Sequence, residues 1–171
     1  MSFIELAEKR RSIRSFNPDP VPEDLLNEIL RAGNLAPTAK NLQPFYFIVV
    51  RDACKLDELA LSYPAPFFQE APVVIVICTE AASGWVRDRY DGKNYCEVDA
   101  AIAIDHMTLA AADLGLGSCW IGAFDPVKVT STMRLPDGIE PLAMLLVGYS
   151  NEEGREKVRK PLKELVRYEQ W

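Results

Sequence analysis

The sequence predicts one domain that is built from both helices and strands. Its 171 residues fall within the usual length of a single domain, and 49% of them are hydrophobic, which is enough for one sizeable core. The apolar residues follow two patterns along the chain, one with helical spacing and one of short unbroken runs typical of buried strands. Charged residues at 26% and aromatic residues at 9% are ordinary for a folded globular protein.

Helices and strands are each predicted from spacing and from the residues that bound them. Helical spacing predicts helices over residues 2–10, 22–31, 54–61, 97–114 and 126–133. Unbroken apolar runs predict strands over residues 45–50, 72–78, 118–124 and 142–149. The runs at 45–50 and 72–78 are nearly all apolar, so we expect both strands to be covered on both faces.

Three segments are candidates for contact with a second copy of the chain or with a ligand. The helix at 97–114 is apolar nearly all round, which suits a central core helix or a subunit interface, and we favour a dimer interface. The tail at 161–171 carries Leu165, Val166, Tyr168 and Trp171, so we expect it to dock on a partner subunit. The polar and aromatic segment 81–95 is interpreted as a mobile excursion and a possible lid, with a variable surface loop as the alternative.

The distribution of charge argues for a small anionic ligand. The net charge is −6, and general binding to nucleic acid needs an extended basic surface, so that class is excluded. Nine of the 19 basic residues nevertheless form two knots near the ends of the chain, Lys9, Arg10, Arg11 and Arg14 in one and Arg155, Lys157, Arg159, Lys160 and Lys163 in the other. Two local knots in an acidic chain indicate a small anion held at a point.

The first knot has the residue types of a phosphate clamp. If this segment is extended, alternation places Arg10, Ser12 and Arg14 on one side, with Arg11 and Ile13 on the other. Arginine offers a planar fork of donors that suits bidentate contact with phosphate. The alternative is a solvated basic end of the first helix, which complements the helix dipole.

Two further stretches suit a ligand rim. Thr38, Asn41 and Gln43 lie in a short loop that Pro37 and Pro44 stiffen, although an ordinary helix-to-strand connection would use the same residues. After the third strand, Gly122 allows the backbone to approach a flat ligand closely.

Several classes of protein are excluded. No run of about 18 apolar residues is present, so no transmembrane helix is predicted. The first residues include an acid and lack the charged and then apolar pattern of a signal peptide, which indicates a cytoplasmic protein. The four cysteines lack metal-ligand spacing and are interpreted as reduced thiols. The lone His106 cannot build a multi-histidine metal site, and no metal is expected. Gly115 and Gly117 end a helix and precede a strand, whereas the glycines of a dinucleotide-binding motif follow a strand and begin a helix.

Four stretches, in this order, resemble one family. They are Arg10–Phe16, Ala36–Phe45, Gly115–Phe124 and Arg159–Leu162. With matching lengths between them, the whole chain of 171 residues resembles the FMN-dependent nitroreductase family in its short form. The resemblance implies an α+β fold, a central mixed or antiparallel sheet flanked by helices, in an intertwined homodimer with FMN at the subunit interface.

The resemblance also assigns the cofactor site residue by residue. Arg10 and Ser12 would hold the FMN phosphate, Arg14 would reach the phosphate or stabilise negative charge on the flavin, and Arg159 would complete the clamp. The full set of implied cofactor-binding residues is Arg10, Arg11, Ser12, Arg14, Pro37, Thr38, Ala39, Asn41, Trp120, Ile121, Gly122, Ala123, Arg159 and Lys160, with Pro37 to Asn41 reaching the flavin of the other subunit. The pair Thr38-Ala39 departs from the serines common in the family, and Phe45 replaces a common tryptophan.

The implied activity is NAD(P)H-dependent reduction of nitroaromatic, quinone or similar electron-poor acceptors in a ping-pong cycle. The flavin carries that chemistry, so no residue is assigned as catalytic. Two alternatives remain open at this point, a family member with a specialised substrate and a flavin-binding sensor or storage protein. A nucleotide-binding module is disfavoured by the pI of about 4.9, and nothing in the sequence separates NADH from NADPH.

Overall fold

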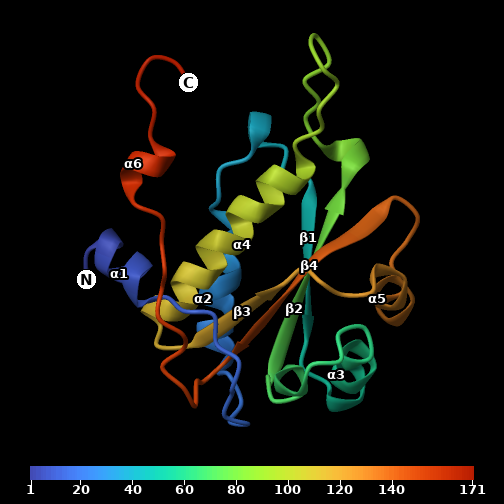
Figure 1. The fold of residues 1–171 in the computed structure, drawn as a ribbon. Coiled ribbons are helices and arrows are strands. Elements are labelled where there is room, and N and C mark those ends of the chain that lie inside the picture. The colour runs from blue at the N-terminus through green and yellow to red at the C-terminus, as the bar shows by residue number, and fades with distance from the viewer.

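A four-stranded antiparallel sheet with helices on both faces forms the body of the molecule (Figure 1). The computed structural model describes all residues from 1 to 171. The strands are β1 (Phe45–Val50), β2 (Val73–Glu80), β3 (Gly117–Ile121) and β4 (Ile139–Gly148), and they lie in the order β1-β2-β4-β3. The expected α+β class is therefore confirmed, and the sheet is antiparallel rather than mixed.

The predicted helices are confirmed with small shifts at their ends. They are α1 (Phe3–Lys9), α2 (Glu23–Asn34), α3 (Ala53–Ala60), α4 (Cys96–Asp113) and α5 (Pro126–Met133), and a short α6 (Leu162–Leu165) lies in the tail. Local chemistry explains the starts, since Ser2 forms a capping box with Glu5 and Asp125 accepts backbone N–H bonds ahead of Pro126. Figure 1 shows α2 and α4 on one face of the sheet and α3 and α5 on the other.

The central strand β2 is buried on both faces, as its unbroken apolar run predicts. Val73, Ile75 and Ile77 pack in the core cluster that contains α2 and α4 residues. Val74, Val76 and Cys78 pack in the second cluster, on the face of α3 and α5. Because β2 and β4 pair in the middle of the sheet, their side chains join both layers.

Strand β1 departs from the prediction that it is covered on both faces. It forms an edge of the sheet, and Tyr46 is 50% exposed. The Tyr46 hydroxyl donates to Glu80 at 2.9 Å, which satisfies the polar end of the side chain at the surface. Edge position rather than composition decides burial here, and the apolar run alone does not carry that information.

Helix α4 is the main helix of the core. Ala100, Ala103 and Met107 have no exposed surface, and the Cβ position of Gly33 in α2 lies only 2.9 Å from the Met107 Cγ atom. The absence of a side chain at Gly33 therefore lets α2 approach α4 closely. Val98 remains 38% exposed, so the helix also leaves apolar surface outside the core.

The segment 81–95 forms a braced hairpin that projects beyond the sheet (Figure 1). Val86 and Asn94 form an antiparallel bridge, and the ring centroids of Trp85 and Tyr95 lie 5.0 Å apart. The guanidinium of Arg87 binds the Asp91 carboxylate and donates to the Tyr95 hydroxyl at 2.9 Å. These contacts give the hairpin a defined shape that its polar sequence does not reveal.

No helix is long and apolar enough to span a bilayer. The four cysteines are free thiols, with Cys54 exposed and the other three buried. No group of three or more potential metal ligands comes together, and His106 lies half-buried on α4.

Candidate functional site: a basic cluster and a strained loop

The segment after α1 runs extended along the free edge of β3. Ser12 forms a parallel bridge with Ser118, and the N–H of Ile13 donates to the Ser118 carbonyl at 2.9 Å. Ile13 is buried in the core and holds the segment in place. A Cβ added at Gly117 would lie 2.8 Å from the Ile13 Cγ1 atom, so glycine is needed for this close approach.

Arg11 and Ile13 lie on the same side of this segment, as alternation predicts. A Cβ on Gly154 would lie 2.6 Å from the Arg11 Cβ atom and 3.2 Å from Ile13, so Arg11 and Ile13 share one side. Gly154 has a φ of +76°, a backbone conformation that favours glycine. Alternation predicts the other side for Arg10, Ser12 and Arg14, yet Arg10 lines the same small cavity as Arg11 and Ile13.

Lys157 joins this group, and the sequence interpretation did not assign it to the site. Burial first, and then the positive charges of Arg10, Arg11 and Arg159, lower the pKa of Lys157. Its Nζ atom donates to the carbonyl of Ala7 at the end of α1. We call Arg10, Arg11, Ser12, Arg14, Lys157 and Arg159 the basic cluster. In the sequence, Lys157 lies two residues before Arg159, and this spacing places both side chains on one side of an extended segment.

None of the cations of the basic cluster forms a salt bridge, although the nearby Glu8 carboxylate raises the pKa of Lys157 as the smallest of the influences on it. The four salt bridges of the molecule all lie elsewhere. The guanidinium of Arg11 turns back to the carbonyls of Glu8 and Arg10, so it caps α1, while Arg159 donates only to the Val158 carbonyl at 3.0 Å. Lys160 is exposed and makes no hydrogen bond. Mutual repulsion among cations that form no salt bridge favours the binding of an anion.

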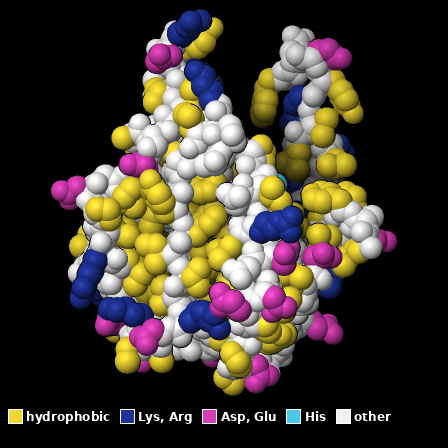
Figure 2. All heavy atoms as spheres, turned by 180° about the vertical axis from the view of Figure 1, so that it is seen from behind, with side chains coloured by type: hydrophobic (Ala, Val, Ile, Leu, Met, Phe, Trp, Pro, Cys, Tyr) yellow, Lys and Arg dark blue, Asp and Glu magenta, His cyan; other side chains and the backbone are white.

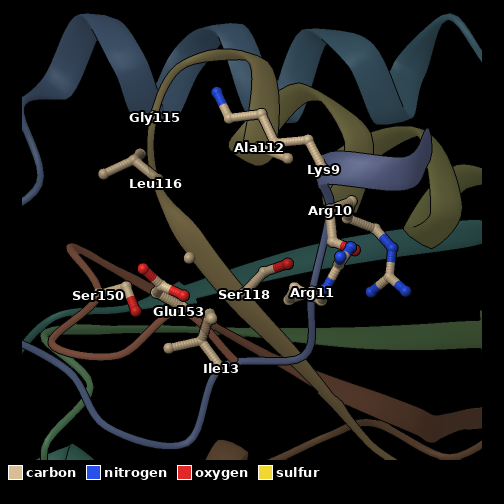
Figure 3. Close-up of a pocket in the computed structure, with 11 residues that line it drawn as sticks. Lys9, Arg10, Arg11, Ile13, Ala112, Gly115, Leu116, Ser118, Ser150 and Glu153 are labelled. Atoms are coloured by element: carbon tan, nitrogen blue, oxygen red, sulfur yellow. The ribbon is translucent and has the colours of Figure 1, made fainter. Parts of the chain in front are cut away.

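A small cavity lies against the same segment (Figure 3). Its volume is about 110 Å³, and Figure 3 shows Ser150 and Glu153 on one side of β3 and Arg10 and Arg11 on the other. The neighbouring Glu152 accepts a hydrogen bond from the backbone N–H of Arg14 at 2.5 Å. Ligand pockets commonly measure about 300–1,000 Å³, so one chain does not enclose a flavin here.

The loop between α2 and β1 is the second part of the site. Lys40, Asn41 and Gln43 all have positive φ values, of 52°, 57° and 46°. Left-handed conformations at three of four consecutive positions are costly, least so for asparagine, and backbone strain of this kind gathers at functional sites. The Gln43 N–H donates to the Thr38 hydroxyl at 3.2 Å, and the Gln43 amide donates to the Asn41 carbonyl at 2.7 Å.

The end of β3 is the third part. Trp120 is 41% exposed on the α2 and α4 side of the sheet, whereas its neighbours Cys119 and Ile121 are buried on the α3 and α5 side. A Cβ added at Gly122 would meet nothing within 4 Å, so the backbone here is open to an approaching group. Ala123 follows in the same open turn.

The loop and the basic cluster lie at opposite ends of α4. The loop is attached to Asp99 in the first turns of α4, and the cavity at the basic cluster is lined by Ala112 at the last turn. Thirteen residues separate these positions, which is about 20 Å of helix at 1.5 Å per residue. The structure therefore brings the N-terminal residues and the Lys157 segment together within one chain, and it does not bring the loop to them.

The fold is an α+β domain that gathers several cations outside salt bridges at one end of α4. The chain belongs to the nitroreductase family, since the family description "Nitroreductase family" matches residues 7–63 and 60–149. A nitroreductase family protein from Clostridium difficile has a solved structure that is similar over 100% of both chains, with a TM-score of 0.91 and 34% identity.

Curated relatives with functional names are similar to the chain as well. A putative NADH dehydrogenase/NAD(P)H nitroreductase of Methanothermobacter thermautotrophicus is 31% identical, covering 89% of this chain and 79% of its own length. An FMN reductase [NAD(P)H] of Bacillus subtilis is 32% identical, covering 88% of this chain and 67% of its own length. The family resemblance stated from the sequence motifs is thereby confirmed.

The residues present fit FMN, which the family implies. The basic cluster supplies a hydroxyl and cations that form no salt bridge, which suits a dianionic phosphate. The open backbone at Gly122 beside exposed Trp120 provides a surface for a flat ring system. The donor set thus matches both the charged and the planar part of the cofactor.

Proposed function

We propose that this chain is an FMN-dependent oxidoreductase that takes electrons from NAD(P)H and reduces nitroaromatic, quinone or similar electron-poor acceptors. The observation that carries the proposal is the basic cluster, whose cations form no salt bridge and gather around Lys157, so that burial first and then Arg10, Arg11 and Arg159 lower its pKa. Relatives named FMN reductase and NADPH-dependent oxidoreductase support the donor and the cofactor. When bound, FMN accepts electrons from the nicotinamide nucleotide and passes them to the acceptor.

The chain's own residues bind and orient the cofactor in this proposal. Arg10, Ser12, Lys157 and Arg159 hold the phosphate, and the exposed guanidinium of Arg14 stabilises negative charge on the flavin. Trp120, Gly122 and Ala123 line the ring system together with the backbone of Ile121, whose side chain is buried in the core, and Lys160 lies at the margin of the clamp. No protein acid or base is assigned, because the cofactor supplies the chemistry.

We propose further that two copies of the chain build each site. An antiparallel pairing of α4 with its copy would place the loop end of one helix beside the cluster end of the other. The two parts of the site, which lie about 20 Å apart within one chain, would then come together across two chains. Pro37, Thr38, Ala39 and Asn41 would then reach the flavin held by the partner subunit. The exposed Val98 on α4 supplies apolar surface for this pairing.

Two projecting segments suit the same assembly. Figure 2 shows the hairpin and the C-terminal segment as separate projections above a face rich in hydrophobic side chains. Leu162, Leu165, Tyr168 and Trp171 are exposed in the tail, and we assign the segment 161–171 to docking on the partner. The hairpin at 81–95 leads directly into α4 beside the loop, so we assign it to a lid over the acceptor. The exposed free thiol of Cys54 supports a reducing, cytoplasmic compartment.

An absorbance spectrum followed by anaerobic addition of NADH and then NADPH tests the function. We expect flavin bands near one FMN per chain that bleach with at least one nucleotide. Bound flavin that neither nucleotide bleaches would favour a sensor or storage role or a specialised substrate. Protein that stays colourless after incubation with FMN would contradict the proposal.

A further inference from the structure

Asp99 is the most buried charged residue of the chain, and the assigned cofactor chemistry does not use it. It lies on α4 with 2% of its surface exposed. Its Oδ1 atom accepts a hydrogen bond from the backbone N–H of Ala39 at 3.0 Å. Its Oδ2 atom is buried without any hydrogen-bond partner. Burial of a half-satisfied carboxylate opposes folding, so the position needs an explanation other than stability.

The bond to Ala39 joins the middle of the strained loop to the core, and at the end of the loop the Glu80 N–H donates to the Pro44 carbonyl at 3.0 Å. The other hydrogen bonds of residues 38–43 stay within the loop or join it to Phe45, the next residue but one along the chain. Those local bonds set the shape of the loop but do not fix its position on the molecule. Ala36 and Phe45 anchor the two ends of the loop in the core, and the Asp99 carboxylate ties the middle of the loop to α4 in the same core cluster.

We infer that Asp99 is a positioning residue that holds the loop at Ala39 in the geometry that receives FMN. The inference rests on the proposed function, because the loop must touch the cofactor. Three left-handed residues follow Ala39 closely, so the loop lies in a conformation that an untethered chain would leave. By fixing the start of this run, Asp99 keeps the Thr38 and Asn41 groups in place before the cofactor arrives. Preorganisation of this kind raises affinity by reducing the entropy lost on binding.

Two substitutions remove the same hydrogen bond from its two ends. Asp99→Ala deletes the acceptor, and Ala39→Pro deletes the donor. Thr38 has φ −131° and ψ 154°, the extended conformation that precedes a proline, and Ala39 begins a 3-10 helix, where proline is tolerated. Asp99→Asn keeps an oxygen that can accept from Ala39. Asp57→Ala, an exposed carboxylate on α3, is the matched control.

The test measures FMN affinity by fluorescence titration and amide hydrogen exchange of residues 39–43 in the FMN-free protein. We expect Asp99→Ala and Ala39→Pro each to raise the Kd for FMN about tenfold and to speed exchange in the loop. We expect the double variant to be no weaker than either single variant, because both remove one bond. Asp99→Asn and Asp57→Ala should stay within about twofold of the wild type.

Two results would overturn the role of Asp99. One is that the Kd for FMN and the exchange rates of the loop amides in Asp99→Ala both stay within twofold of the wild-type values. If that variant does not fold, the same result in Ala39→Pro, which leaves the core intact, decides the question. Wild-type protein that takes up no FMN would instead overturn the proposed function, and the exchange data would still report whether Asp99 holds the loop.

Discussion

Replacement of Lys157 by methionine should affect stability and cofactor binding in different ways. In the FMN-free protein, burial and the charges of Arg10, Arg11 and Arg159 lower the pKa of Lys157 from its ordinary value of 10.5. A lysine with a lowered pKa destabilises the folded state while it is charged, and this destabilisation is lost as pH rises through the folded-state pKa toward 10.5. Methionine removes that repulsion and keeps the apolar stem, at the loss of the bond to the Ala7 carbonyl.

The magnitudes follow from these contacts. The two effects on the FMN-free protein oppose each other, so the free energy of unfolding at pH 7 should change by less than about 1 kcal/mol. A hydrogen bond to a charged group contributes about 1.5–3 kcal/mol, so loss of the Lys157 contact with phosphate should raise the Kd for FMN about 10- to 150-fold. Urea unfolding and fluorescence titration measure the two quantities.

Riboflavin and Lys163 provide the controls for this substitution. Riboflavin lacks the phosphate, so its affinity should be the same in the wild type and in Lys157→Met. Lys163 lies in the second basic knot but outside the basic cluster, so Lys163→Met should bind FMN like the wild type. An unchanged Kd for FMN in Lys157→Met, or an equal loss of affinity for riboflavin, would refute the assignment of this cluster to phosphate.

Three other perturbations have definite outcomes. Gly117→Ala would place a Cβ 2.8 Å from the Ile13 Cγ1 atom, so we expect a loss of about 1–3 kcal/mol in the free energy of unfolding, measured by urea titration. Native protein should consume one equivalent of a thiol reagent at Cys54, and Cys54→Ser should consume none, because burial of Cys78 raises the pKa of its thiol to about 11. Hydrogen bonds from Arg87 and then from the Lys93 backbone lower the pKa of Asp91 from 3.8 to about 2. The stabilisation of the hairpin by Asp91 is therefore fully present above pH 3.8 and lost as pH falls through about 2, which a carboxyl NMR titration measures.

The strands and helices were largely predictable from the sequence because their patterns are local. The run Val73–Cys78 predicted a doubly buried strand, and Asp125 with Pro126 predicted the start of α5, both as the structure has them. Exposure of Tyr46 was not predictable in this way, because it depends on which strand forms the sheet edge. The braced hairpin was also missed, since Arg87, Asp91 and Tyr95 stabilise it only through contacts made after the turn forms.

In the candidate site too, the features encoded locally were predictable and those that depend on tertiary contacts were not. Alternation predicted the shared side of Arg11 and Ile13, because an extended segment fixes the direction of its own side chains. Lys157 needed the structure, because more than 100 residues separate it from Arg10 and only the packing of Gly154 on Arg11 brings the two segments together. Asp99 gave no signal in a helix that looks uniformly apolar. Its partner is a backbone N–H far along the chain, which no side-chain pattern reports.

A mixed dimer tests most directly the central claim that the basic cluster of one copy and the loop of the other hold one FMN. One copy carries Arg10→Ala in the cluster and the other carries Asn41→Ala in the loop, with different affinity tags so that the mixed species can be purified. We predict that each uniform dimer binds FMN weakly, whereas the mixed dimer binds one FMN per two chains with wild-type affinity, because one of its sites is intact. Weak binding by the mixed dimer at both sites, or FMN binding by a monomeric chain, would contradict the account.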